Sequence, residues 1–391
     1  MILQSNIAKL GYYTVHGEIF LWKSDALTAA KNPKDVIYHF NDDIYNKFDW
    51  KHDPEPSTSI DELYRRRAQS LRDRYDYIIV MYSGGPDSKN ILDVFVNNGI
   101  FIDEIVNINS YAQTGISDDT VHNADYINNV IPVLEDLQKS PGFKSKITIL
   151  DEVELMKKHM AWTTKIGNHM MFGAQLLHGG TNMYFTKQIW TRYVDHIWKK
   201  IVNGVKLAVI IGADKPILTI ENGRYGAVFG DLAQNGSGFS YYDDDYRYLD
   251  IMEPFYQSVE TVDIIIKQSH ILKQFMENNP DPQYYSIWKG NNKHRPSYSC
   301  PSKHGFGNLR YDIYHKLIYP SWKPGFVTPK INRMVLRKED TWWLHQMHSE
   351  ENKIFEYVLQ KFIKDLRELT TSDVDLHKLS ASHKTRPYFI E

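Results

Sequence analysis

Cysteine is almost absent from this chain, since Cys300 is the only one among 391 residues. A single thiol excludes an internal disulfide, a four-cysteine zinc site and any mechanism that needs two thiols in one chain. The sequence also lacks an apolar run of membrane-spanning length, and its first residues lack the apolar core of a secretory signal. We therefore expect a globular, cytoplasmic protein with no membrane partner.

Net charge is small as well, with a formal value of −2 at pH 7. No overall electric field therefore points to a nucleic-acid partner. Local charge is less even, because Lys and Arg far outnumber Asp and Glu in residues 289–340. That stretch could line an anionic active site, hold tRNA or another polynucleotide, or be a solvated surface.

The most informative segment present is S-G-G-P-D-S, from Ser83 to Ser88, which lies between an apolar run at 77–82 and a helical pattern. Two glycines after a buried strand let the backbone turn with several amides facing one side, and the next helix adds its positive end. Ser83 and Ser88 add hydroxyl donors, whereas Asp87 would repel phosphate unless a divalent cation lay between them. We interpret the segment as a loop that binds Mg-ATP; the alternative is an ordinary turn capped by Ser88.

These residues resemble the PP-loop of the N-type ATP pyrophosphatases, a family that includes asparagine synthetase, lysidine synthetase and tRNA-thiolating enzymes. The resemblance implies an adenine nucleotide α-hydrolase-like fold and cleavage of ATP between its α- and β-phosphates. A substrate oxygen would attack the α-phosphate, pyrophosphate would leave, and a nucleophile would then displace AMP. The lone cysteine disfavours the paired-thiol and zinc-binding branches. Met1 stands where a class II glutaminase carries cysteine, so we expect the amine to come from elsewhere.

Apolar periodicity predicts an α/β fold with a doubly wound, mostly parallel sheet, because strands and helices alternate from residue 75 onwards. Strands are expected at 77–82, 104–109, 146–150 and 207–211, and helices at 60–74, 88–98, 118–139 with a kink at Pro132, and within 152–203. Hairpins are expected at His16-Gly17 and at E-N-G-R, and core-facing helices at 258–276 and 352–367. We expect a small N-terminal α+β appendage, a PP-loop ATP-binding α/β domain and a mainly helical C-terminal region with a basic substrate loop, at 1–60, 61–235 and 236–391.

A second loop, G-A-D-K-P, follows the strand expected at 207–211. It resembles the G-x-G-A-D-E loop of asparagine synthetases, with Lys215 in place of their glutamate. By that resemblance Asp214 would hold Mg²⁺ together with Asp87, and Lys215 would contact a phosphate. Ligands of such sheets bind at the carboxyl ends of the strands, near the switch in strand order, so we expect both loops to meet in one crevice. Taken alone, a Gly-Asp turn is more often only a turn.

The expected site has three further parts. Pyrophosphate is assigned to Ser83, Gly84, Gly85, Asp87 and Ser88. Adenine is expected at the ends of the first two strands, near Tyr82, Ile108 and Ser110. Charge on the adenylate would be stabilised from the basic loop by Lys293, Arg295 and Lys303.

The expected function is that of an ATP-dependent adenylating ligase similar to the synthetase domain of asparagine synthetase, with the resemblance covering about residues 76 to 216. Such an enzyme would activate a carboxylate or a carbonyl-type oxygen for attack by an amine. Two alternatives stay open. One is the same adenylation applied to a nucleic-acid base or tRNA, and the other is a nucleotide-binding module without catalysis.

Overall fold

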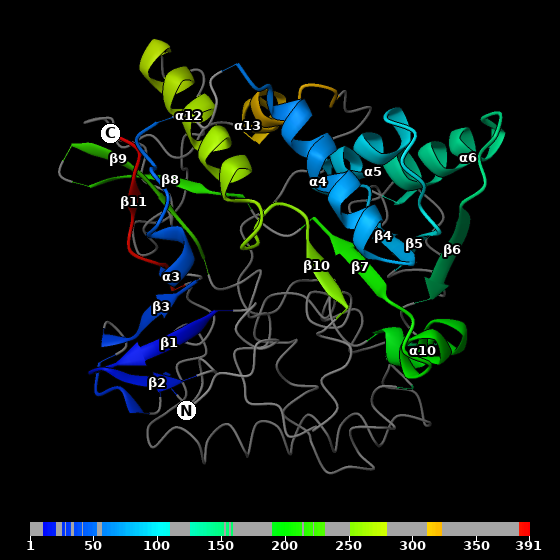
Figure 1. The fold of residues 1–391 in the computed structure, drawn as a ribbon, viewed down its shortest axis with the longest axis horizontal. Coiled ribbons are helices and arrows are strands. Elements are labelled where there is room, and N and C mark those ends of the chain that lie inside the picture. Colours follow the sequence, from blue (N-terminus) through cyan, green and yellow to red (C-terminus); the bar gives the residue numbers. More distant parts are fainter. Residues whose placement is uncertain are drawn as a thin grey trace.

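The computed structural model describes fifteen stretches of the chain, and every structural statement below concerns these residues (Figure 1). They are 11–20, 26–27, 29–32, 35–40, 42–52, 57–109, 126–151, 154–155, 158, 190–212, 215–221, 223–230, 251–279, 311–322 and 383–391.

A five-stranded parallel sheet forms the centre of the fold, in the order β10-β7-β4-β5-β6. The strands are β4 (Tyr77–Met81), β5 (Glu104–Asn109), β6 (Lys146–Asp151), β7 (Leu207–Ile211) and β10 (Met252–Pro254). The apolar runs of β4 and β7 are almost entirely buried, as is typical of parallel strands covered on both faces. The predicted α/β class and parallel sheet are confirmed, and the arrangement is compatible with a Rossmann-like doubly wound fold.

The strand order reverses at β4. From β4 the sheet grows outwards through β5 to β6, and the chain then returns to place β7 on the other side of β4. The loops that leave β4 and β7 therefore emerge side by side at the carboxyl edge of the sheet. In open α/β sheets this switch point is where ligands bind.

Helices α4, α5, α12 and α13 gather on one side of the sheet (Figure 1). The helices are α4 (Ile60–Arg74), α5 (Pro86–Asn97), α6 (Ile131–Lys139), α10 (Asp195–Val202), α12 (Val262–Asn278) and α13 (Tyr311–Ile318), with the short α3 at Asp42–Tyr45. A 3-10 turn covers Trp190–Tyr193. None of the helices described is long and apolar enough to cross a membrane.

Local sequence explains where two of these helices begin. Ser59 precedes α4 and accepts a hydrogen bond from the Glu62 amide at 3.2 Å, which caps the helix. Before α6 the chain forms a π-helical turn, Tyr126–Val130, and Pro132 then lies in the first turn of α6. Proline fits there because its missing amide would have no helical partner. The predicted kink is thus a change of helix type just before Pro132, and residues 118–125 lie outside the description.

The N-terminal residues pack against later parts of the chain and share a core with them. Two three-stranded sheets are present, β2-β1-β3 and β11-β9-β8. Their strands are β1 (Tyr12–Val15), β2 (Glu18–Phe20), β3 (Ile37–His39), β8 (Ile217–Glu221), β9 (Arg224–Val228) and β11 (Tyr388–Phe389). Both predicted hairpins are confirmed, since β1 pairs with β2 and β8 with β9. Apolar side chains from both sheets and from α12 form one cluster, because sheets this short bury too little surface to be stable alone.

Two contacts join the N-terminal residues to Tyr388 of β11. The rings of Trp50 and Tyr388 stack with centroids 4.6 Å apart. The Tyr388 hydroxyl donates to Asp42, which also bonds His39 at 2.6 Å. This shared core joins residues on both sides of the domain boundaries expected at residues 60 and 235. The central sheet also extends past the second boundary, because β10 belongs to it.

Candidate functional site

The S-G-G-P-D-S segment forms the turn after β4 and the first three residues of α5. Gly84 has a φ of 80°, a conformation that glycine adopts without strain. Gly85 is the N-cap of α5, and no side chain among the described residues caps this end. Ser88 lies within the helix, where its Oγ donates to the Gly85 carbonyl at 3.0 Å and accepts from the Ser83 amide at 3.2 Å. Ser88 is therefore not the cap of an ordinary turn, and the positive end of α5 carries no capping side chain.

The loop after β7 touches this turn at Gly212. A Cβ atom placed on Gly212 would lie 3.0 Å from the Asp87 Cβ and 3.1 Å from the Ser88 amide nitrogen. Two of the three nearest atoms belong to the backbone, so a side chain would force the loops apart. The two loops that the sequence predicts to converge meet here because residue 212 is glycine.

The Asp87 carboxylate is the charged centre of this meeting point. Lys215 Nζ lies 2.5 Å from Asp87 Oδ1, and the Tyr319 hydroxyl donates to the same oxygen at 2.5 Å. The Asp87 and Lys215 side chains are 20% and 17% exposed. Lys215 comes from the loop after β7, and Tyr319 directly follows α13. Three segments far apart in the sequence are thus joined at one oxygen atom.

Electrostatics keep Asp87 ionised. Burial by itself would raise the pKa of this carboxyl, but the charge of Lys215, the nearby His315 and the hydrogen bonds from Lys215 and Tyr319 outweigh it and lower the pKa to about 2. Burial and the charge of Asp87 raise the pKa of the Tyr319 hydroxyl well above its usual range. At neutral pH, Tyr319 is therefore a neutral donor to a negative carboxylate.

Asp87 should make folding stability depend on pH. The pKa falls from a usual 3.8 to about 2 on folding, so the stabilisation is complete above the usual pKa and is lost as the pH falls through the folded value. We expect the unfolding free energy of the wild type to lose roughly 2 kcal/mol relative to Asp87→Asn between about pH 5 and about pH 2. Urea denaturation of both proteins measures this difference.

Asp93 provides the control, because burial raises its pKa and the sign of the effect reverses. Relative to Asp93→Asn, the wild type should gain stability as the pH falls. A wild-type minus Asp87→Asn difference that stays constant across the acid range would contradict the assignment.

Tyrosines and one asparagine fix the backbone behind Asp87. The Tyr256 hydroxyl donates to the Asp87 carbonyl at 2.8 Å and accepts from Asn90 Nδ2 at 3.0 Å. The Tyr256 and Tyr319 rings lie 5.4 Å apart. The Tyr64 hydroxyl donates to the Ile318 carbonyl at 2.8 Å, which fixes the end of α13 next to Tyr319. Sequence reasoning missed Tyr256 and Tyr319, since no local motif marks a tyrosine that reaches the site only through packing.

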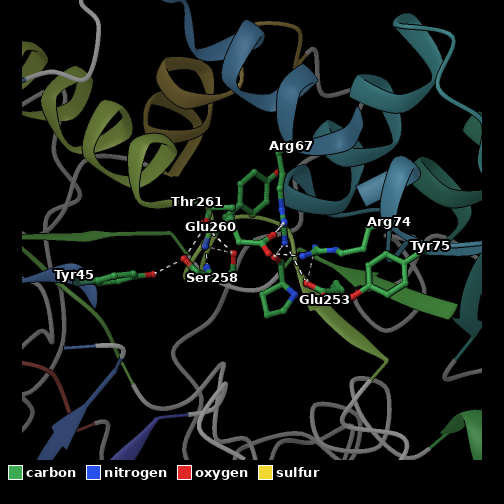
Figure 2. Close-up of polar contacts among 10 residues, drawn as sticks. Tyr45, Arg67, Arg74, Tyr75, Glu253, Ser258, Glu260 and Thr261 are labelled. Carbon is green, nitrogen blue, oxygen red and sulfur yellow. Dashed lines mark hydrogen bonds and ion pairs between the residues drawn. The ribbon is translucent and has the colours of Figure 1, made fainter. Parts of the chain in front are cut away.

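An ion network with a buried centre holds the segment that carries Tyr256 (Figure 2). Arg67 on α4 pairs with Glu260 at 2.6 Å and with Glu253 at 3.3 Å. The Arg67 and Glu253 side chains are only 3% and 8% exposed. Arg74, about two helical turns further along α4, lies 3.7 Å from Glu253. The network fixes the segment after β10 against α4 and so places Tyr256 behind Asp87.

No family model matches the chain. No curated protein sequence matches it either.

Of the residues expected to bind nucleotide, one group is assembled in the structure: Ser83, Gly84, Gly85, Asp87, Ser88 and Lys215. Tyr82 is different, because its side chain is 1% exposed and its hydroxyl donates to the Asn129 carbonyl at 3.0 Å. Its ring is part of the core and is not placed to contact adenine. Ile108 is half-buried on β5. The remaining expected residues lie outside the described stretches: Ser110, Asp214, Lys293, Arg295 and Lys303.

The arrangement does not fit Asp87 as a ligand of Mg²⁺. Lys215 and Tyr319 both occupy its Oδ1, and the Lys215 ammonium group neutralises its charge and would repel a second cation. Asp214, the other expected ligand, is not among the described residues. Within the described stretches, no cluster of three or more His, Cys, Asp or Glu side chains could hold a metal ion.

Proposed function

We propose that this chain is an ATP-dependent, AMP-forming ligase similar to the synthetase domain of asparagine synthetase. The observation that carries the proposal is the position of S-G-G-P-D-S at the switch in strand order, closed by Lys215 from the neighbouring loop. Because many functions share one fold, the proposal rests on this site and not on the sheet.

In the proposed reaction, an oxygen of a carboxylate or carbonyl-type substrate attacks the α-phosphorus of ATP. The bond from that phosphorus to the α-β bridging oxygen breaks, and pyrophosphate leaves with its electron pair. An amine then displaces AMP from the activated substrate. The amino end of α5, the Ser83 hydroxyl and the Lys215 ammonium group would bind the pyrophosphate as its negative charge develops. ATP would enter as its Mg²⁺ complex, in which the phosphates supply ligands to the ion.

The test is to incubate the purified chain with α-labelled ATP, Mg²⁺ and a protein-free filtrate of cell extract, and to separate AMP from ADP. We expect AMP and pyrophosphate from the wild type, and a rate lower by about 100-fold or more from Asp87→Asn, because that change removes the charge that holds Lys215. Circular dichroism of the variant checks that it stays folded.

Each other outcome selects a different function. Formation of ADP would contradict the reaction class. AMP formation that disappears when the filtrate is treated with nuclease would favour modification of a polynucleotide. Binding of ATP without turnover in any filtrate would favour a nucleotide-binding module without catalysis.

A further inference from the structure

We infer that Lys215 is the cation that binds the pyrophosphate part of the nucleotide, and that Asp87 and Tyr319 are positioning residues for its ammonium group. The inference rests on the proposed function for the chemical class of the ligand, a polyphosphate. It departs from the family resemblance, which makes Asp87 a metal ligand and implies a glutamate at position 215.

The Asp87–Lys215 pair is balanced in charge. The Asp87 Oδ1 atom is hydrogen-bonded to both the Lys215 ammonium group and the Tyr319 hydroxyl. A carboxylate in this state needs no metal ion to neutralise it. The pair presents a cation beside the phosphate-binding turn, where an isolated Asp87 would repel phosphate.

Lys215 has more hydrogen-bond donors than its contacts with the described residues use. An ammonium group has three N–H donors. Within the part of the chain that the structure describes, Asp87 is the one hydrogen-bond partner of Lys215 Nζ. Two of these donors have no partner among the described residues and could bind a ligand, and the side chain keeps 17% of its surface exposed. The Tyr314 ring, 5.9 Å from Nζ, lies close enough to favour the cation further.

Described residues before and after Lys215 are held by contacts with other segments. The Tyr314 hydroxyl donates to the Pro216 carbonyl at 2.8 Å, immediately after Lys215. On the other side, Gly212 packs against Asp87 and Ser88. A lysine side chain is long and flexible, so holding it before the ligand arrives lowers the entropy lost on binding. Contacts with α13 and with the start of α5 thus set the position of the Lys215 ammonium group.

Isothermal titration of the full-length chain with inorganic pyrophosphate tests the inference, once with Mg²⁺ and once with a chelator. We expect the wild type to bind pyrophosphate under both conditions. Lys215→Met should weaken binding by about tenfold or more under both, since a charged hydrogen bond is lost. Lys215→Arg should restore part of the affinity. Tyr319→Phe and Asp87→Asn should weaken binding less than Lys215→Met and should leave the effect of Mg²⁺ unchanged.

Two further variants separate binding from folding. Lys273→Met removes a lysine that is 20% exposed and paired with Glu277 on α12, far from the turn in sequence, and should bind pyrophosphate as the wild type does. If Lys215→Met leaves Asp87 uncompensated and does not fold, the double variant Asp87→Asn, Lys215→Met removes both charges. That double variant should fold and should bind pyrophosphate more weakly than Asp87→Asn, which keeps Lys215; equal binding by the two would overturn the inference.

The outcomes distinguish this inference from the proposed function. If the wild type does not bind pyrophosphate at all, the assignment of a phosphate-binding turn is wrong, and both the inference about Lys215 and the proposed function are overturned. If the wild type binds and Lys215→Met binds equally well, the inference is overturned and the proposed function stands. If binding requires Mg²⁺ and Asp87→Asn abolishes that requirement, Asp87 is a metal ligand and the inference is again overturned.

Discussion

Arg67→Met is expected to lower the free energy of unfolding by about 3–5 kcal/mol, because it leaves a buried carboxylate without its main partner. Glu253 is 8% exposed, and its contact with Arg74 is longer, at 3.7 Å, than its contact with Arg67, at 3.3 Å. Methionine has nearly the length of the arginine stem, so the change removes charge more than volume. Urea denaturation measures the loss.

Arg66→Met is the matched control on the same helix. Arg66 pairs with Glu62 at 2.9 Å, but the two side chains are 54% and 33% exposed. A pair in contact with solvent contributes about 0–1 kcal/mol, so this variant should be nearly as stable as the wild type. Replacing both Arg67 and Glu253 by neutral residues should recover part of the loss. Equal stability of Arg66→Met and Arg67→Met would show that burial does not set the strength of the network.

Gly212→Ala is expected to reduce kcat/KM of the proposed reaction by about tenfold while leaving the protein folded, because the contact must open by a few tenths of an ångström and a misplacement of about 1 Å near a reacting group costs about 100-fold. The added Cβ would meet the Asp87 Cβ at 3.0 Å and the Ser88 amide nitrogen at 3.1 Å, and the backbone of α5 cannot rotate away as a side chain can. The contact between Gly212 and the start of α5 must therefore open by a few tenths of an ångström, which displaces the backbone that carries Asp87.

Amide hydrogen exchange gives a second measurement that does not depend on catalysis. Faster exchange in residues 83–89 is expected for Gly212→Ala, with little change elsewhere. Gly99→Ala is the control, because a Cβ at that position meets open space although φ is +65°. It should cost about 1 kcal/mol of stability from backbone strain and leave exchange at 83–89 unchanged. Wild-type turnover and exchange in Gly212→Ala would contradict the close contact.

Local sequence predicted most of the central fold. The β-α-β alternation predicted β4, β5, β6 and β7 to within a residue, because each is an apolar run bounded by a turn or a helix. β10 was not predicted. It consists of M-E-P, whose charged second residue and proline match no strand pattern, and it exists because β7 offers a parallel edge at Val209 to Ile211.

The sequence predicts which loops form the candidate site, but not which of their side chains contact each other. Asp87 and Lys215 could be placed at one crevice, since both follow strands of a parallel sheet. The ion pair between Asp87 and Lys215 could not be predicted, because charge patterns in a sequence do not specify which groups meet or how deeply they are buried. The contacts of Tyr256 and Tyr319 with Asp87 are still harder to predict, because they depend on the ion network around Arg67 and on the position of α13.

The hydrogen bond from Tyr319 to Asp87 joins residues 232 positions apart, and this has a consequence for synthesis of the chain on the ribosome. A nascent chain that has completed β4 and β7 already contains Asp87 and Lys215 but not the hydroxyl that completes their triad. The apolar cluster shared by the two small sheets is completed later still, because it includes Tyr388 of β11 (Tyr388–Phe389). Contacts of such long range form late and slowly. The turn between β4 and α5 is therefore made early in synthesis, whereas its surroundings are finished only when nearly the whole chain has emerged.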